Sequence, residues 1–276
     1  MKTVAYLGPQ NTNTHFAAKK KFGAGYGYLH APTVEEVFQL VEREKVDFGV
    51  VPIENSLEGA VTHTLDRFVD FRNSPVNIYG EIDLPIEHFL IMQRDTLKEK
   101  IRIIYSHPQA LAQCKQWLDK NYSRATPRET LSTAEAVEKL LTKQSIWELN
   151  EQAAIGRREL AVQHKLKAIA LPIDSDNRTR FLIMSLRSAK RGRKNKTSIM
   201  FALKDKPGAL YDALTPFKKY GINLTKIESR PSRRKAWEYV FFIDLQGHRL
   251  DSSVAKAIAA LKKGVTWLKV LGSYHV

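Results

Sequence analysis

Apolar runs alternate with helical patterns through residues 1–190, and this alternation narrows the choice of fold more than any other feature. Three segments read as strands: 3–8 (TVAYLG), 47–53 (DFGVVPI) and 101–106 (IRIIYS). Four read as helices: 13–22, 33–44, 107–122 and 132–143. Thr33 and Ser132 are expected N-caps, and Glu36 completes a capping box with Thr33. The pattern predicts an α/β fold with largely parallel sheets covered by helices.

A basic segment, 188–196, is typical of a linker, and a second pattern follows it. Strands are expected at 196–205, 222–231, 237–248 and 265–274, and helices at 207–221 and 251–264. Pro207 is expected to open the first of these helices and Gly221 to close it. The order βαββαβ predicts a ferredoxin-like domain over 197–276.

The chain carries 44 lysines and arginines against 29 acidic residues, a formal net charge of +15. Such an excess raises the question of nucleic-acid binding. The basic residues are dispersed, however, and the densest run, 190–196 (KRGRKNK), lies between two strand-like segments. Aromatic RNA-binding signatures, zinc-ligand spacing and helix-turn-helix patterns are missing from the sequence. We therefore expect no nucleic-acid partner and a general positive field that attracts small anions.

Compartment and membrane association are also constrained. No stretch reaches the roughly 18–20 apolar residues of a transmembrane helix, so no membrane association is expected. The N-terminus reads directly as a strand and predicts no signal peptide. Cys114 is the single cysteine, which excludes an intrachain disulfide and favours a reducing cytoplasm. Its helical spacing predicts a packing role.

Several familiar motifs are absent or misplaced. The glycines of GAGYGY (23–28) do not follow GxGxxG spacing and come after a helix, so the segment is interpreted as a loop. Neither a phosphate loop nor a GxSxG elbow occurs. Histidines 15, 63, 88 and 107 lack metal-ligand spacing, and no metal or cofactor is expected.

Polar residues gather at strand ends, where α/β sheets carry their sites. In GPQNTNTH (8–15), Thr12 and Thr14 lie beside helix N-terminal amides that suit a carboxylate, although a plain helix cap would look the same. In SHPQA (106–110), Ser106 occupies a second strand-to-helix junction, and here too a simple cap is the alternative.

Two further junctions complete this set. PIENS (52–56) places Asn55 at the end of a strand. There it is either part of a hydrogen-bonding site or part of a structural cluster of polar side chains. NRTRF (177–181) places Thr179 between Arg178 and Arg180 where a strand begins. Because unpaired buried charges are costly, these arginines are either solvated or bound to an anion.

Together these blocks resemble the prephenate dehydratases, which turn prephenate into phenylpyruvate. AYLGP, VPIENSLEGAVTHTLD, SHPQALAQC, STAEAV, AAIGRREL and NRTRF match the family in order, and KDKPGALYDAL and IESRP match the ACT domain that follows. One departure is clear: the family's first block reads close to GPxGTFSH, and Asn11 and Asn13 replace its Gly and Phe. Asn tolerates positive φ, which would preserve the turn.

The resemblance implies a catalytic domain over 1–188 with two α/β lobes, like a periplasmic binding protein. The lobes are expected at about 1–80 with 176–188, and at 81–175, with the active site between them. Thr179 matches the family's catalytic threonine. Thr12, Asn55, Ser106 and Arg180 match its substrate-binding positions.

Charge flow in the reaction constrains Arg180. Negative charge leaves the ring carboxylate in the transition state, so an arginine clamp there would stabilise the ground state. If Arg180 contacts substrate, it should face the pyruvyl carboxylate; the alternative is an ion pair that braces the strand. Strand alternation would send Thr179 and the two arginines to opposite faces, and Arg178 is expected to be solvated.

The resemblance also implies regulation by L-phenylalanine, bound between ACT domains of a homodimer or homotetramer. The matching positions are Gly208, Ala209, Leu210, Asn223, Glu228 and Ser229. An oligomerisation surface without ligand is the alternative. The expected activity is prephenate dehydration; arogenate dehydration and a non-catalytic ligand-binding protein are the rivals.

Overall fold

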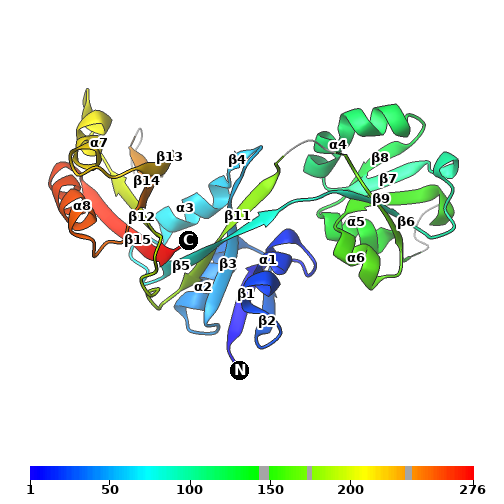
Figure 1. The fold of residues 1–276 in the computed structure, drawn as a ribbon, viewed down its shortest axis with the longest axis horizontal. Helices are drawn as coiled ribbons and strands as arrows, with labels where there is room; N and C mark the ends of the chain where they lie inside the picture. The colour runs from blue at the N-terminus through cyan, green and yellow to red at the C-terminus, as the bar shows by residue number, and fades with distance from the viewer. Residues whose placement is uncertain (143–148, 173–175, 234–237) are drawn as a thin grey trace. The chain divides into compact units, whose positions relative to one another are not determined.

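The computed structural model describes residues 1–142, 149–172, 176–233 and 238–276. Two expected boundaries lie outside these residues: Lys143, the last residue of the helix expected at 132–143, and Trp237, the first residue of the strand expected at 237–248. Residues 174–175, which precede NRTRF, also lie outside them. The chain divides into two units, which are described separately (Figure 1). Unit 1 comprises Met1–Leu7, Ala17–Leu84 and Thr179–Val276; unit 2 comprises Gly8–Phe16 and Pro85–Arg178.

Unit 1 begins with a sheet of order β2-β1-β3-β11-β5, with β4 paired to β3. Its strands are β1 (Thr3–Leu7), β2 (Gly27–Ala31), β3 (Phe48–Asn55), β4 (Gly59–Ala60), β5 (Asn77–Pro85) and β11 (Arg178–Ser185). β1 is parallel to both β2 and β3, whereas β11 is antiparallel to β3. The expectation of largely parallel sheets therefore holds only for part of this sheet. The loop expected at 23–28 is shorter, because β2 already starts at Gly27.

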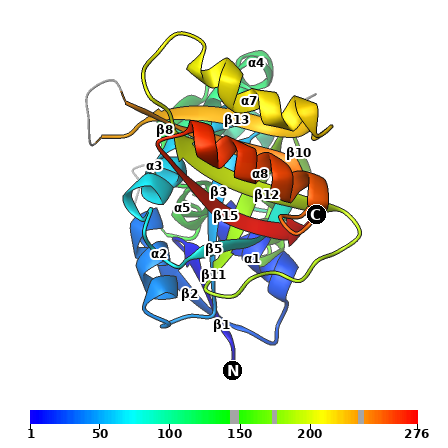
Figure 2. The same cartoon turned by 90° about the vertical axis from the view of Figure 1, so that its left-hand side faces the viewer.

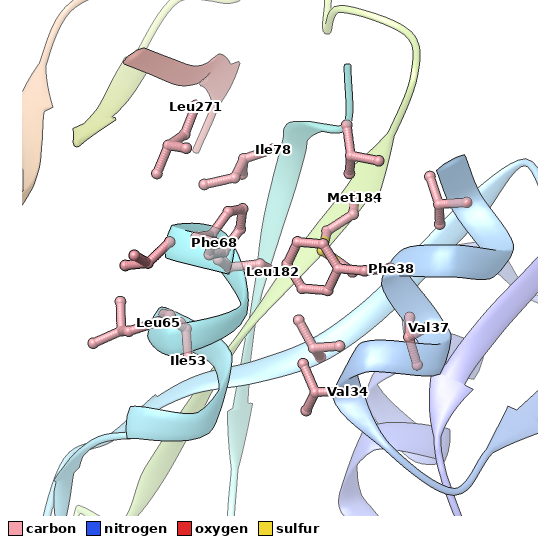
Figure 3. Close-up of a cluster of buried hydrophobic side chains, with 14 of the residues drawn as sticks. Val34, Val37, Phe38, Ile53, Leu65, Phe68, Ile78, Leu182, Met184 and Leu271 are labelled. Carbon is pink, nitrogen blue, oxygen red and sulfur yellow. The ribbon is translucent and has the colours of Figure 1, made fainter. Parts of the chain in front are cut away.

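The helices α2 (Val34–Glu42) and α3 (Thr62–Asp70) provide one side of the unit 1 core. Figure 3 shows Phe38 of α2 and Phe68 of α3 beside Leu182 of β11. The two phenyl rings meet edge to face with centroids 4.9 Å apart. Thr33 caps α2 as expected, accepting the Glu36 N–H at 3.1 Å.

The C-terminal part of unit 1 is an antiparallel sheet of order β13-β14-β12-β15 with two helices on one face (Figure 2). Its elements are β12 (Asn195–Ala202), α7 (Ala209–Lys219), β13 (Leu224–Pro231), β14 (Tyr239–Gln246), α8 (Ser252–Gly264) and β15 (Trp267–His275). The predicted βαββαβ order is confirmed. The helix expected to open at Pro207 begins at Ala209.

The other face of this C-terminal sheet belongs to the same hydrophobic cluster as α2 and α3. Leu271 of β15 lies near Ile78 of β5 (Figure 3). The approach is close at Gly272, where an added Cβ would lie 2.1 Å from the carbonyl oxygen of Ile78. Glycine is therefore required there to bring the two sheets together.

Unit 2 contains a sheet of order β10-β6-β9-β7-β8. Its strands are β6 (Phe89–Met92), β7 (Ile103–Ser106), β8 (Thr126–Glu129), β9 (Gln152–Gly156) and β10 (Lys167–Ala170). Its helices are α1 (Asn13–Phe22, shared with unit 1), α4 (Pro108–Asn121), α5 (Thr133–Lys139) and α6 (Arg158–Gln163), with single turns η1 (Lys98–Lys100) and η2 (Leu149–Glu151). β7 is parallel to β8 and β9, while β6 is antiparallel to β9 and β10, so this sheet is also mixed.

Residues 8–16 belong to unit 2, although the first lobe was expected to run unbroken to about residue 80. Arg157 explains the difference. Its Nη1 donates to Asn13 Oδ1 at 3.2 Å, and its guanidinium lies 5.1 Å from the centre of the Phe16 ring. These contacts hold the start of α1 to unit 2.

Candidate active site

The amino end of β11 meets the carboxyl end of β3, because these two strands are antiparallel. Thr179 is thereby the register partner of Asn55, and Arg180 that of Glu54. NRTRF lies at the amino end of β11 and PIENS at the carboxyl end of β3, so only antiparallel pairing could place them side by side. The structure thus brings together two of the five predicted catalytic and substrate-binding residues, Thr179 and Asn55.

A hydrogen bond joins the two side chains: Asn55 Nδ2 donates to Thr179 Oγ1 at 3.0 Å. Asn55 Oδ1 accepts the backbone N–H groups of Leu57 at 3.0 Å and Glu58 at 3.2 Å. These two backbone donors fix which end of the amide faces Thr179. Thr179 Oγ1 is therefore an acceptor in this bond, and its own proton points elsewhere.

The pairing of β3 and β11 becomes irregular directly after these residues. The register shifts between Arg180 and Phe181, and Phe181 pairs with Pro52. Proline cannot donate to a sheet ladder and is confined within sheets to edges and bulges. Pro52 thus accounts for a bulge at the strand tip, and Thr64 Oγ1 donates to its carbonyl oxygen at 2.6 Å.

Arg180 forms ion pairs within the protein, which is the alternative to a substrate contact considered above. Its Nη2 lies 2.8 Å from Glu54 Oε2, and its Nη1 lies 2.6 Å from Asp244 Oδ2 and 3.2 Å from Glu81 Oε2. Burial disfavours the charged guanidinium, but Asp244 and Glu81 outweigh it and raise the Arg180 pKa above its ordinary value. The guanidinium is thus engaged by three carboxylates, as in the ion-pair alternative, and a contact of Arg180 with the substrate's pyruvyl carboxylate stays a prediction.

Two lysines join this arrangement. Lys196 Nζ lies 2.7 Å from Glu81 Oε1, and Lys226 Nζ lies 3.0 Å from Glu54 Oε1. We call the following six residues the charge cluster: Glu54, Glu81, Arg180, Lys196, Lys226 and Asp244. Burial raises the pKa of Glu54, but hydrogen bonding and charge from Lys226, together with Arg180, outweigh it and leave the pKa below its ordinary value.

Arg178 is half-exposed, with its Nη1 3.9 Å from Asp176 Oδ1. Asp176 is itself 91% exposed, so the pair is well solvated. Such exposed pairs contribute little to stability. Arg178 and Arg180 therefore sit in different environments although they flank the same threonine.

Thr12 lies in unit 2 at the start of α1. Its hydroxyl donates to the Pro9 carbonyl at 3.0 Å, and its own carbonyl accepts the Phe16 N–H at 3.0 Å. Asn11 adopts φ 66°, so asparagine does preserve the left-handed turn where the family has glycine. The Thr12 carbonyl thus accepts a backbone hydrogen bond from the first turn of α1.

Ser106 is the last residue of β7. It is fully buried, and its Oγ donates to the Ile155 carbonyl of β9 at 2.9 Å. The adjacent His107 caps α4, accepting the Gln109 N–H on Nδ1 at 3.3 Å. Ser106 therefore ties β7 to β9, and its role as a substrate ligand stays a prediction.

Sequence reasoning missed the charge cluster, Arg157 and a partly buried hydrogen-bonded chain in unit 2. In that chain, His88 Nε2 lies 2.8 Å from Gln113 Oε1, which also accepts from Asn177 Nδ2 at 2.9 Å. Burial lowers the His88 pKa below its ordinary value. The available signals were weak: Arg157 directly follows a strand tip, and Asn177 opens NRTRF.

The positions expected to hold phenylalanine lie on two elements of the C-terminal domain. Gly208, with φ 76°, precedes α7, and Ala209 and Leu210 line a cavity of about 180 Å³ that Tyr239 and Phe241 also border. Glu228 and Ser229 lie on β13, an edge strand, and the Asn223 carbonyl accepts the Gln246 N–H at 2.9 Å. The edge strand also exposes Ile227.

Within the described ranges, His, Cys, Asp and Glu side chains form no group of three that could hold a metal ion. In that same part of the chain, no helix combines the length and apolarity needed to span a bilayer.

Two mixed α/β sheets followed by a βαββαβ domain define the fold class of this chain. The family model for prephenate dehydratase matches residues 4–189, and that for the ACT domain matches residues 197–263. The chain belongs to the prephenate dehydratase family. The predicted family, fold class and enzyme class are thereby confirmed.

Three relatives illustrate the similarity. A bifunctional chorismate mutase/prephenate dehydratase of Aquifex aeolicus is 47% identical over 98% of this chain and 73% of its own. A prephenate dehydratase of Methanocaldococcus jannaschii is 37% identical over 100% of this chain and 98% of its own. The crystal structure of prephenate dehydratase with L-Phe from Arthrobacter aurescens superposes with a TM-score of 0.90, at 34% identity over 99% of this chain and 90% of that one.

Proposed function

We propose that this chain converts prephenate to phenylpyruvate, with the Thr179 hydroxyl hydrogen-bonding the oxygen that leaves the ring. The observation that carries the proposal is the Asn55 amide, which donates to Thr179 Oγ1 and so directs the hydroxyl proton away from itself. A hydroxyl that accepts from a fixed donor is oriented to donate to a third group. That orientation is what a leaving oxygen requires.

The reaction explains why a weak acid suffices. Prephenate loses CO₂ and hydroxide, and the ring becomes aromatic, so the overall change is strongly downhill and needs no cofactor. The barrier lies in expelling hydroxide, and a hydrogen bond to the departing oxygen lowers it. Thr179 is too weak an acid to give up its proton unaided, so a proton relayed through it from a neighbouring polar group or water completes the departing water molecule.

Arg180 and Ser106 remain proposed substrate ligands, although each has partners within the protein. We retain Thr12 as a proposed ligand, because it precedes the ten-residue helix α1, and the first amides of a helix have no carbonyl partner within that helix. Asn55 acts through Thr179. The net charge of +15 supports the capture of a doubly charged anion.

The test compares initial rates on prephenate and on arogenate for the wild type, Thr179→Ala and Thr179→Ser. We expect turnover of prephenate, about a 10²–10⁴-fold loss in the alanine variant, and partial activity in the serine variant, which keeps the hydroxyl. Thr215→Ala, which removes an exposed hydroxyl from α7, should match the wild type. Turnover of arogenate alone would establish the arogenate alternative, and failure on both substrates would leave a binding protein.

We also propose that L-phenylalanine regulates this activity at Gly208, Ala209, Leu210, Asn223, Glu228 and Ser229. Support comes from the cavity beside Ala209 and from the L-Phe complex of the Arthrobacter relative. Control requires the ligand to favour one quaternary state. Titration with phenylalanine should lower the rate and change the light scattering; a flat response in both would refute regulation.

A homodimer or homotetramer and a cytoplasmic location complete the proposal. β13 is an edge strand with exposed Ile227, and such edges can be covered by a neighbouring copy. The single cysteine, buried in α4, is compatible with a reducing compartment. Sedimentation of the purified chain tests the oligomer directly.

A further inference from the structure

The charge cluster joins the C-terminal domain to the β3–β11 strand tips. Glu54, Glu81 and Arg180 come from the first sheet, whereas Lys196, Lys226 and Asp244 come from the C-terminal sheet. The side chains of all but Glu54 are between 8% and 16% exposed. Tyr274 Oη and Ser198 Oγ extend the network, since Ser198 donates to Asp244 Oδ1 at 2.6 Å.

The cluster contains three cations and three carboxylates, so its charges balance. Balance matters because a buried charge that loses its partner is strongly destabilising. Neutralising Asp244 leaves Arg180 with fewer compensating charges, and neutralising Lys226 does the same to Glu54. Each change must shift Arg180 or Glu54 or admit water around it.

Arg180 and Glu54 are the chain neighbours of the candidate catalytic pair. Arg180 follows Thr179, Glu54 precedes Asn55, and the two charged residues face each other across the strands. Beyond them the ladder is broken by the bulge at Pro52. Side-chain contacts between Arg180 and Glu54 therefore reinforce the pairing of Thr179 with Asn55, which the register shift separates from the rest of the ladder.

We propose that Asp244 and Lys226, both in the C-terminal domain, are positioning residues for the dehydration. They hold Arg180 and Glu54, and through these neighbours they keep the Thr179 hydroxyl aligned by Asn55. The inference rests on the proposed function of Thr179. It gives the C-terminal domain a part in the basal reaction, independent of any effector.

The experiment uses the full chain without phenylalanine. Asp244→Asn and Lys226→Met should each lower kcat about tenfold or more while KM for prephenate stays within about twofold, because alignment affects the transition state more than binding. Asp212→Asn, which loses an exposed carboxylate 3.7 Å from Lys206 in the same domain, and Lys263→Met should match the wild type. If Asp244→Asn does not fold, Ser198→Ala, which keeps every charge, should still lower kcat by a few-fold.

A double-mutant cycle separates positioning from a general loss of structure. If the cluster acts through the aligned pair, Asp244→Asn should cost much less in an Asn55→Ala background than in the wild type. An equal loss in both backgrounds would overturn the proposal, as would an Asp244→Asn enzyme with unchanged kcat. A wild type that is inactive on prephenate would refute the proposed function itself. If instead the wild type is active, Thr179→Ala has lost its activity and Asp244→Asn is fully active, only the positioning role is refuted.

Discussion

Asn55 and Thr179 lie 124 residues apart in the chain, yet the Asn55 amide donates a 3.0 Å hydrogen bond to the Thr179 hydroxyl. The bond has a direction, because Asn55 Oδ1 is occupied by two backbone N–H groups. The direction of this bond determines which group can receive the Thr179 proton. A threonine that accepts from asparagine keeps its proton for substrate, whereas one that donates to a neighbour does not.

Reversing this hydrogen bond should disable the enzyme. An aspartate at position 55 only accepts, so in Asn55→Asp the Thr179 proton turns toward the carboxylate. We expect kcat on prephenate to fall about 10²-fold or more, with the circular dichroism spectrum unchanged. Asn77→Asp, at a residue whose amide donates to the Pro75 carbonyl, serves as the matched control. A rate equal to wild type in Asn55→Asp would contradict the assigned direction.

The buried carboxylate of Asp66 should be a major contributor to unit 1 stability. Asp66 is 4% exposed, and Arg230 of β13 approaches it with Nε at 2.9 Å and Nη2 at 3.3 Å, while Arg233 contacts the same carboxylate. Asp66→Asn should lower the free energy of unfolding by about 2–4 kcal/mol, since it leaves two cations without their carboxylate. Urea denaturation measures this.

Asp70→Asn is the control for that measurement, because Asp70 pairs with Arg67 on the exposed side of the same helix. Its effect should stay within about 1 kcal/mol. Equal losses for the two variants would show that burial of the Asp66 ion pair contributes nothing beyond an ordinary surface pair.

Glu54 should make stability depend on pH in the acid range. Its pKa is lowered in the folded state from an ordinary value of 4.5, so the folded protein favours the ionised form. The stabilisation is therefore present above that ordinary value and is lost as pH falls through the folded-state pKa. The difference in unfolding free energy between wild type and Glu54→Gln should be largest near neutral pH and shrink on acidification.

Urea unfolding of both proteins at several pH values between about 7 and 3 measures this difference. Glu138→Gln, at an exposed position on α5, should show a small difference at every pH. A difference that grows as the pH falls would reverse the expected sign.

Cys114 should be unreactive in the native protein. It is fully buried in α4, and this burial raises the pKa of its thiol to about 12. Only the thiolate reacts, so a disulfide reagent at about pH 8 should label the chain after denaturation and not before. Rapid labelling of the native protein would show that α4 opens readily.

Local signals predicted the local structure well. The segment 13–22 forms α1 with the expected bounds, Thr33 and Ser132 cap their helices, and Asn11 keeps the turn. These features depend on side chains within a few residues of the backbone groups they satisfy. The order of strands and helices after residue 195 followed for the same reason.

Strand direction was less predictable. Largely parallel sheets were expected, but β11 pairs antiparallel with β3, and β6 with both of its neighbours. Alternating strands and helices do not reveal which distant segment will insert into a sheet. Yet the antiparallel insertion of β11 is what joins NRTRF to PIENS.

The amino-acid sequence alone determined the βαββαβ domain, the family resemblance and the choice of Thr179 and Asn55, because these depend on patterns and motifs within short segments. Only the tertiary structure decided that Arg180 belongs to an ion-pair cluster with Glu81 and Asp244, and that Ser106 is enclosed between strands. The physical reason is that a charged or hydroxyl side chain takes its role from whichever partner folding brings within hydrogen-bonding distance. For Arg180 and Ser106, those partners lie far away in the chain.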